Sequence, residues 1–375
     1  MVSHLHIRMD QRLPLAQQAE KGHNRWHPDI APAIRIIAGS RIEIETLDGL
    51  DGQISPETTR DELARIDMGR IHPLTGPVYV EDAEPGDLLA VIIEEIRPAD
   101  SGYTIINPGF GFLRDVFASP YIMHWEISGG FARTKELPNV RIPAAPFMGV
   151  MGVAPSHELL DRIVAREADV SRHGGLILPP DPVGAIPTDI TIARRGLRTI
   201  APQEFGGNMD VKQMVAGTTL YLPVQAPGGL FSVGDAHFAQ GDGETCGTAI
   251  ETSATFVARF ELLRGEATRR GQMDPSFARD NDFADHETSL PRRFYATTGI
   301  PMHRDGRNEH ENITVAARNA LLNMIDHIVD AYGYSPEQAY CLTSVAVDLR
   351  ISQTVDVPNV IVSAFLPLNI FERRV

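Results

Sequence analysis

Short runs in which polar and apolar residues alternate are the main pattern along this chain, and they predict β-strands. In Arg41–Thr46 charged residues alternate with isoleucines, as in a strand that buries one face. Val345–Ser352 alternates in the same way near the C-terminus. Further predicted strands lie at 88–96, 186–193, 218–224 and 360–366. Because 32 glycines and 27 prolines are spread between these runs, we expect many short strands and turns.

Helical periodicity is strong only near the C-terminus. From Thr314 to Tyr332 apolar residues recur every three or four positions, and Gly333 follows as a C-terminal stop. Ser335 and Gln338 then have the spacing of a capping box, with a proline at the first helical position between them. The pattern therefore predicts one long amphipathic helix followed by a short one.

Two other segments complete the layout. A weaker amphipathic pattern predicts a helix over His157–Asp169 that covers a sheet edge, and the polar stretch Thr268–Pro291 predicts a long loop, an insertion or a lid. We expect a β-rich part over 1–155, a second β-rich part over 156–266 and an α+β part over 267–375, packed as one compact unit. The predicted fold class is mainly β with some α (α+β).

Composition and charge narrow the possible partners. The 375 residues are enough to bury a sizeable core, and 34 Lys and Arg against 49 Asp and Glu give a formal net charge of −15. A negative protein repels phosphate backbones and anionic lipid headgroups. We therefore expect neither nucleic acid nor membrane as a partner.

The cysteine count favours a reducing compartment, and the shortness of the apolar runs argues against secretion and membrane insertion. Cys246 and Cys341 are the only cysteines, which is too few for a disulfide framework, and the N-terminal residues lack the apolar core of a signal peptide. The longest apolar stretch, 357–371, is interrupted by prolines and asparagines and is too short to span a bilayer. We expect a soluble, cytoplasmic protein.

Acidic and imidazole side chains are concentrated in the glycine-rich segment 205–251. If Asp235 and His237 lie on a strand, they point to the same face because they are two residues apart. Asp210 follows a Gly-Gly-Asn-Met turn, and Glu251 ends the segment. Carboxylate oxygens together with a neutral imidazole suit a divalent cation, so these four residues are candidate metal ligands.

Simpler explanations exist for the same residues. An Asp-x-His pattern is short and common, so Asp235 is also compatible with a turn and His237 with a satisfied core histidine. Glu251 is also compatible with a strand-end carboxylate paired with Arg259 at the surface.

Other histidines along the chain have ordinary structural explanations. His23 and His27 bracket Trp26, a spacing that favours turn packing over metal ligation. His72 precedes a proline, and His124 stands beside a tryptophan; both patterns are typical of core histidines, although His124 also remains a candidate pocket residue.

Several unusual sequence motifs resemble those of the acetamidase/formamidase family. The central ones are GGNMD at 206–210, AGTTLYLPVQAPGGLFSVGDAHFAQGDGE at 216–244 and CGTAIE at 246–251. The resemblance extends over most of the chain through GHNRW (22–26), HPLTGPVYVEDAEPGD (72–87), FMGVMGVAP (147–155), YATTGI (295–300) and LRISQTVDVPN (349–359).

This resemblance implies hydrolysis of short-chain amides such as formamide or acetamide to a carboxylate and ammonia. It also implies a homo-oligomer and a scaffold with jelly-roll-like and barrel-like β parts, next to a smaller α/β section that carries the Thr314–Tyr332 helix.

Amide hydrolysis requires a polarised carbonyl, an activated nucleophile and a proton for the leaving nitrogen, and a metal with nearby carboxylates can supply all three. We assign Asp235 and His237 to the metal and to catalysis, Asp210 and Glu251 as further ligands, and Glu244 as the proton shuttle. Asn208, Gln240 and His124 are the candidate substrate-binding residues. Zinc is the preferred ion, with calcium, magnesium and manganese as alternatives.

Two alternative functions remain open from the sequence. Cys246 beside Glu244, with Lys212 as the amine, offers the residues of a covalent thiol amidase. A β scaffold with a structural cation at Asp235 and His237 would instead be a non-catalytic binding protein. Release of ammonia from a simple amide distinguishes the enzyme from the binding protein.

Overall fold

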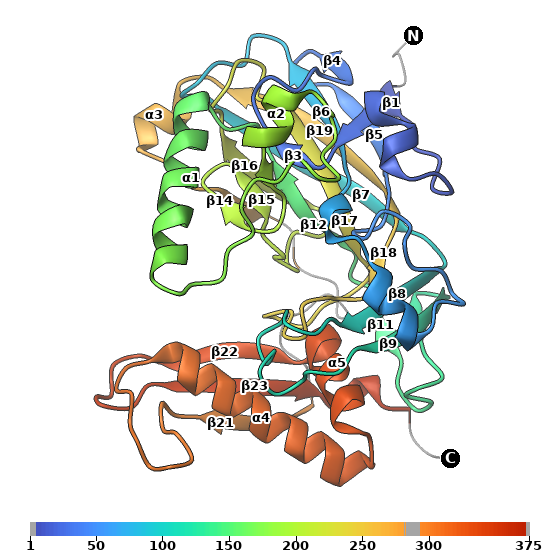
Figure 1. The fold of residues 1–375 in the computed structure, drawn as a ribbon, viewed down its shortest axis with the longest axis vertical. Helices are drawn as coiled ribbons and strands as arrows, with labels where there is room; N and C mark the ends of the chain where they lie inside the picture. Colours follow the sequence, from blue (N-terminus) through green and yellow to red (C-terminus); the bar gives the residue numbers. More distant parts are fainter. Residues whose placement is uncertain (1–4, 281, 283–292, 373–375) are drawn as a thin grey trace.

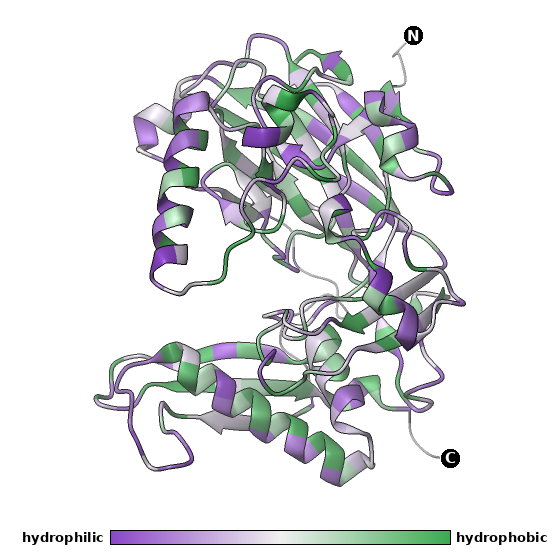
Figure 2. Cartoon of the chain, in the orientation of Figure 1, coloured by the Kyte–Doolittle hydropathy of each residue, from purple (hydrophilic) through white to green (hydrophobic). Residues whose placement is uncertain are grey.

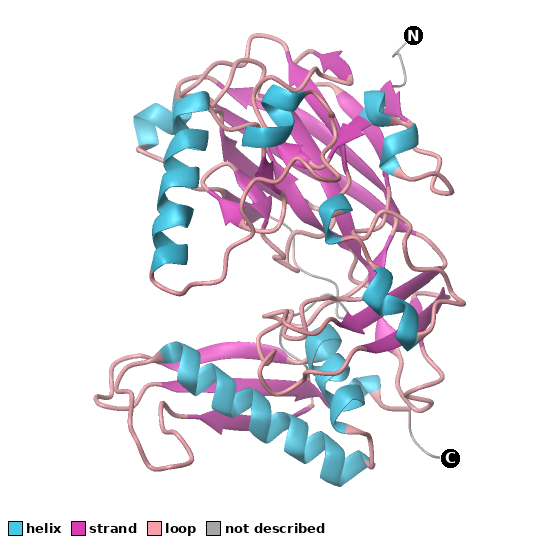
Figure 3. Cartoon of the chain, in the orientation of Figure 1, coloured by secondary structure: helices cyan, strands magenta, loops and turns pink. Residues whose placement is uncertain are grey.

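Two large β-sheets form the body of the molecule, and a smaller α+β part lies beside them (Figure 1). The computed structural model describes residues 5–280, 282 and 293–372. Strands dominate the upper body in Figure 3, whereas the long helix near the C-terminus lies along a separate small sheet. The expectation of a mainly β fold with some α is confirmed.

The first large sheet is antiparallel except at one edge, where β1 runs parallel to β5. Its strands, in spatial order, are β1 (Leu5–Ile7), β5 (Arg41–Thr46), β19 (Ala254–Leu263), β7 (Leu88–Pro98), β16 (Thr218–Pro223) and β20 (Ser276–Arg279). The sheet thus joins strands from all three parts of the chain expected from the sequence.

The second large sheet is centred on β17 (Phe231–His237), which pairs with β6, β12 and β18. Its main path is β11 (Ile142–Pro143), β10 (Phe131–Arg133), β9 (Tyr121–Ser128), β8 (Ser101–Ile106), β18 (Glu251–Thr252), β17, β12 (Phe147–Gly152), β15 (Gly206–Asn208) and β14 (Pro202–Gln203). Off this path, β6 (Leu74–Val80) pairs with β2 (Gly22–His23) and β4 (Ile34–Ile36). A separate pair joins β3 (Arg25–Trp26) to β13 (Leu197–Arg198).

The main hydrophobic core fills the space between the two large sheets. One buried cluster contains side chains from both of them, including Ile44, Val91 and Phe256 from the first sheet and Val78, Met148 and Val233 from the second. Every residue of β17 is buried. A polar side chain on this strand therefore lies in the interior and needs a partner there.

The C-terminal part is a three-stranded antiparallel sheet covered by helices. Its strands are β21 (Phe294–Gly299), β23 (Ile361–Pro367) and β22 (Asp348–Gln353), and its helices are α4 (Ile313–Tyr332) and α5 (Pro336–Ala346). Apolar and polar residues alternate along α4 in Figure 2, and its buried face includes Leu321, Met324 and Ile328. The predicted stop at Gly333 and the capping box at Ser335 and Gln338 are confirmed.

Three further helices lie on the β-rich body: α1 (His157–Arg172), α2 (Ile190–Arg195) and α3 (Glu266–Arg270). The helix expected over His157–Asp169 is confirmed as α1, and Ser156 caps its start. Short 3-10 helices occupy Leu15–Gln17, Ala19–Lys21, Arg60–Arg65, Met68–Arg70 and Leu368–Ile370.

Two predicted strands are partly or wholly wrong. Residues 186–193 form no strand, because Asp189 accepts the backbone N–H groups of Thr191 and Ile192 and starts α2 there. Val345 belongs to α5, since the capping box starts a helix that runs on to Ala346 before β22 begins. The strands expected at 41–46, 88–96, 218–224 and 360–366 are confirmed as β5, β7, β16 and β23.

The polar stretch Thr268–Pro291 is only partly a loop. It contains the end of α3 and strand β20, which pairs with β16. Residues 281 and 283–291 of this stretch lie outside the described part of the chain. Within the described residues, the helices are all too short or too polar to cross a lipid bilayer.

His23 on β2 generates a prediction about stability and pH. Its ring is buried, Nε2 lies 2.7 Å from Ser232 Oγ, and burial lowers its pKa from 6.5 to about 4. Above pH 6.5 the ring is neutral in both the folded and the unfolded chain. Below that value the unfolded chain takes up a proton that the folded chain resists. The free energy of unfolding therefore falls between pH 6.5 and 4, by about 2 kcal/mol from this group at pH 5.

Denaturant unfolding at pH 7.5 and pH 5 tests this prediction. We expect a smaller loss of stability between the two pH values in His23→Gln than in the wild type. Equal losses in the two proteins would contradict it.

Candidate active site

Four carboxylates meet around a single buried imidazole at one end of β17. Asp235 and His237 come from this strand, and Glu251 begins β18, where it is directly opposite His237 in the pairing. Asp210 follows β15, and Glu244 lies in the loop after β17. The structure thus brings together the five residues that the sequence assigned to catalysis and metal binding.

His237 lies at the centre of the cluster, and its side chain is 0 % exposed. Its Nε2 lies 3.2 Å from Glu251 Oε1, 3.5 Å from Asp235 Oδ2 and 4.0 Å from Glu244 Oε1. This nitrogen has no hydrogen-bond partner among the described residues, and neither has the buried Oδ1 of Asp210.

Gln240 orients the imidazole from the other side. His237 Nδ1 lies 3.1 Å from Gln240 Oε1, and Gln240 Nε2 donates to the backbone carbonyl of Asp210 at 2.8 Å. Because Nε2 of Gln240 donates to Asp210, its Oε1 faces the ring and accepts the Nδ1 hydrogen of His237. In the neutral tautomer the lone pair on Nε2 therefore faces the carboxylates.

The backbone at three of the carboxylates has an unusual conformation. Asp210, Asp235 and Glu244 have φ values of 48°, 57° and 41°, in the left-handed region that non-glycine residues rarely adopt. Such residues cost on the order of 1 to 3 kcal/mol each and persist where the surrounding structure holds them. Asp235 adopts this conformation inside a strand, so its side chain reaches the cluster through a local distortion as well as through strand alternation.

Two glycines make room for the carboxylates. A Cβ at Gly149, opposite Asp235 on β12, would lie 2.5 Å from Asp210 Oδ1 and 2.7 Å from Asp235 Oδ2. A Cβ at Gly49 would lie 2.2 Å from Asp235 Oδ1. Any larger residue at either position would push these oxygens out of place.

The electrostatics of the cluster are strongly perturbed. Burial, reinforced by neighbouring carboxylates, raises the pKa of both Asp210 and Glu251 to about 7 and the pKa of Glu244 well above its usual value. Burial disfavours charge on His237, but Glu251 and Asp235 outweigh it and raise the pKa of the ring. For Asp235, His72 and His237 outweigh burial and lower the pKa. Without a cation, the cluster is therefore held together by shared protons.

The residues present fit a divalent cation. Two groups, Asp235–His237–Glu251 and Asp210–His237–Glu244, each have donor atoms within 4.8 Å of one another. A divalent cation would offset part of the negative charge of the four carboxylates and would bind the lone pair of His237 Nε2 in the neutral ring. Metal binding at such a cluster displaces the protons that otherwise hold it together.

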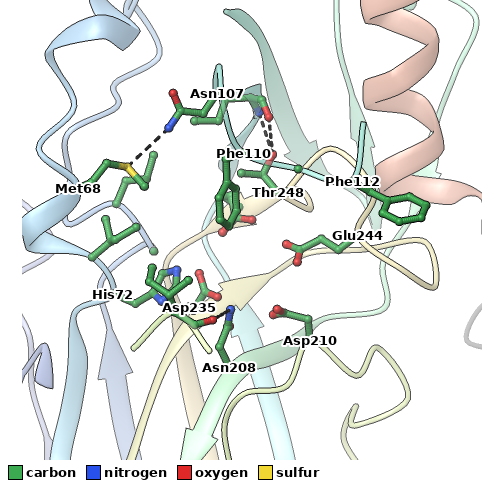
Figure 4. A pocket seen from close by; sticks show the side chains of 18 of the residues that line it. Met68, His72, Asn107, Phe110, Phe112, Asn208, Asp210, Asp235, Glu244 and Thr248 are labelled. Atoms are coloured by element: carbon green, nitrogen blue, oxygen red, sulfur yellow. Dashed lines mark hydrogen bonds between the residues drawn. The ribbon is translucent and has the colours of Figure 1, made fainter. Parts of the chain in front are cut away.

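A cavity of about 470 Å³ opens onto this cluster (Figure 4). The carboxylates of Asp210, Asp235 and Glu244 are turned into it, and Glu251 also lines it. Much of the remaining wall is apolar and comes from distant parts of the chain: Leu50, Met68, Ile71, Ile105, Phe110, Phe112, Leu176 and Ile200. The cavity is thus lined by carboxylates on one side and by apolar side chains on much of the rest.

The three predicted substrate-binding residues have different positions. Asn208 lines the cavity and donates from Nδ2 to the Ile200 carbonyl at 3.1 Å, while its Oδ1 has no partner among the described residues. Gln240 is buried and bonded to His237, outside the cavity lining. His124 is not brought to the cavity, and its Nε2 lies 2.8 Å from the Thr58 carbonyl.

His72 is a cavity residue that sequence reasoning treated as a core histidine. It is half-buried, lines the cavity beside Asp235, and bonds from Nδ1 to the Thr199 carbonyl at 3.3 Å (Figure 4). Its only signal in the sequence was its place at the start of the family-like run 72–87. The surface ion pair considered for Glu251 is wrong, because Arg259 pairs with Glu94 at 2.9 Å.

The residues of the thiol alternative are separated. Cys246 is buried, does not line the cavity, and its Sγ lies 3.4 Å from the Ile105 carbonyl. Burial disfavours its thiolate, but hydrogen bonds from Cys341, Ser344 and Thr248 outweigh it and lower the pKa of Cys246 to about 7. The amine of Lys212 instead pairs with Asp348.

Comparisons with known proteins agree over nearly the whole chain. The model of the Acetamidase/Formamidase family matches residues 8–373. A formamidase from Methylophilus methylotrophus is 32% identical over 93% of this chain and 89% of its own length, and an acetamidase from Mycolicibacterium smegmatis is 34% identical over 89% and 87%. The solved structure of a gamma lactamase from Delftia acidovorans has a TM-score of 0.92 at 31% identity, covering 98% of this chain and 93% of that one.

Gly149 offers a test of the cluster geometry that removes no functional group. We expect Gly149→Ala to displace the Asp210 and Asp235 carboxylates and to lower amide turnover by about 100-fold, the cost typical of a misplacement near 1 Å. Ammonia release and the unfolding temperature would be measured together.

Gly39→Ala is the control, because an added Cβ there meets nothing within 4 Å although its backbone has positive φ. We expect the control to keep wild-type turnover. Full turnover in folded Gly149→Ala would show that the cluster geometry does not matter.

Proposed function

Because this chain belongs to the acetamidase/formamidase family and is an amide hydrolase, we propose that it cleaves small carboxamides to a carboxylate and ammonia with a divalent cation held at His237. The observation that carries this proposal is the buried Nε2 of His237, which faces carboxylate oxygens and has no hydrogen-bond partner among the described residues. Such a buried group of one imidazole and several carboxylates needs a positive charge between its members, and a divalent cation supplies it when the protons are displaced.

Asp235, His237 and Glu251 are the proposed primary ligands, with Asp210 as a further one. When bound, the cation supplies Lewis acidity toward the amide carbonyl and toward water. Gln240 fixes the tautomer of His237 and is a positioning residue rather than a substrate contact. One imidazole among oxygen donors favours zinc, with manganese, magnesium and calcium as alternatives.

Glu244 is the proposed proton donor. It lines the cavity, and burial together with Asp210 raises its pKa well above the ordinary value. A raised pKa favours the protonated carboxyl group, which is the form that can transfer a proton to the amide nitrogen as the carbon–nitrogen bond breaks. His72 and Asn208 line the same cavity and are the proposed polar contacts to the substrate.

Ammonia release from formamide and acetamide, before and after removal of divalent ions by chelation, tests the role of the cation. We expect chelation to lower turnover by at least about 100-fold and re-addition of one divalent ion to restore it. Glu244→Gln should retain metal binding and lower kcat by about 10² to 10⁴.

Cys246→Ala is the matched control and is expected to keep wild-type turnover. Loss of activity in this variant, together with full activity in thoroughly chelated wild type, would support the thiol mechanism and overturn the proposal.

The cavity also favours amides larger than acetamide. Pockets of 300 to 1,000 Å³ typically hold drug-sized ligands, and this cavity measures about 470 Å³ with one apolar wall. The similar solved structure described as a gamma lactamase is in keeping with this second candidate, a longer-chain or cyclic amide.

A series of amides of increasing acyl length tests the role of the apolar wall. Each methylene buried against it contributes about 0.8 kcal/mol, so kcat/KM should rise roughly fourfold per methylene from acetamide to butyramide. Phe110→Ala removes an aromatic ring from the apolar wall and should reduce the increase in kcat/KM per methylene. A steady fall in kcat/KM with acyl length would restrict the substrate to formamide and acetamide.

A further inference from the structure

A second cluster of side chains that can bind a metal lies outside the main cavity, the one lined by Asp210, Asp235 and Glu244. It consists of His27 and Asp29, in the loop after β3, and His157, the first residue of α1. Each of the three offers one donor atom, and these atoms lie within 4.8 Å of one another. The cluster joins a loop of the β-rich body to the start of α1.

The spacing of the donor atoms is close to that of a metal site. His157 Nε2 lies 3.0 Å from Asp29 Oδ1, and His27 Nδ1 lies 3.8 Å from Asp29 Oδ2. Tetrahedral zinc with bonds of about 2.0 to 2.1 Å separates neighbouring donors by roughly 3.3 Å. The His157–Asp29 separation is close to this value and the His27–Asp29 separation is longer, so a side-chain rotation has to bring the donors together around an ion.

His27 is a buried, rigid ligand. Its side chain is 0 % exposed, and burial lowers the pKa of the ring, which favours the neutral form that metals bind. Its Nδ1 accepts the Asp29 N–H at 3.1 Å, and its Nε2 has no partner among the described residues. Coordination through Nδ1, the nitrogen that lies 3.8 Å from Asp29 Oδ2, would replace one backbone hydrogen bond.

The other two ligands are reachable from solvent. The side chains of Asp29 and His157 are 55% and 53% exposed, and both line a cavity of about 450 Å³. This cavity provides an entry path for an ion and space for water in the remaining coordination positions.

From these contacts we propose that His27, Asp29 and His157 form a second metal site that binds zinc or a similar borderline ion. Two imidazoles and one carboxylate favour zinc, nickel or copper over calcium and magnesium, which prefer all-oxygen ligation. The site is separate from the oxygen-rich cluster around His237.

Zinc at this site would fasten the start of α1 to the loop after β3, which holds His27 and Asp29. That loop is anchored in the β-rich body, because Trp26, which precedes His27, packs against Phe205 with ring centroids 5.2 Å apart. A metal bound only by the folded chain stabilises that chain. The expected consequence is a zinc-dependent rise in unfolding temperature.

Zinc titration of the full chain against a chromophoric chelator tests the proposal. We expect the wild type to bind one more tight equivalent of zinc than His157→Gln and to show a zinc-dependent rise in unfolding temperature that this variant loses. His173→Gln is the control, because His173 is 77% exposed at the end of the same helix and its ring pairs with Asp169. The control should bind zinc as the wild type does.

Equal zinc counts and equal thermal shifts in wild type and His157→Gln would overturn the proposal. The outcome does not depend on the proposed amidase mechanism, because His157 does not line the main cavity. Ammonia release measured on the same samples keeps the two claims apart. Loss of one zinc equivalent with unchanged turnover supports this site alone.

Discussion

The site depends on one interaction: a fully buried imidazole whose Nε2 faces several carboxylates and has no hydrogen-bond partner among the described residues. Such an arrangement is unstable unless a proton or a cation lies between the groups. The rest of the local structure holds the carboxylates in place against their mutual repulsion. Left-handed backbone at Asp210, Asp235 and Glu244, and the missing side chain at Gly149, all serve that arrangement.

The fold places this cluster where strands from distant parts of the chain meet. β17 pairs with β6, β12 and β18, so it is surrounded by segments from three separate parts of the sequence, residues 74–80, 147–152 and 251–252. The packed core between the two large sheets supports β17 along its length. This packed support stabilises β17 and so offsets the cost of backbone strain and buried charge at the site. The apolar cavity wall lets an organic group lie next to the carboxylates.

Local spacing predicted one contact of this candidate site. Asp235 and His237 are two residues apart on β17, and the left-handed backbone at Asp235 adds to strand alternation in bringing the two side chains together. His72 and the apolar wall were not predictable in the same way, because their positions depend on long-range pairing of segments that carry no local signal. The wrong strand at 186–193 has a similar cause: an alternating pattern competes there with Asp189, whose capping bonds start a helix. The proposed metal, the cytoplasmic location and the homo-oligomer stay predictions.

The most direct test is anomalous X-ray scattering from crystals of the active protein, with data collected on both sides of the absorption edges of candidate metals. The account predicts a strong, element-specific peak within bonding distance of His237 Nε2 and the carboxylates of Asp235 and Glu251. Crystals of fully active protein with no peak at that position would contradict it.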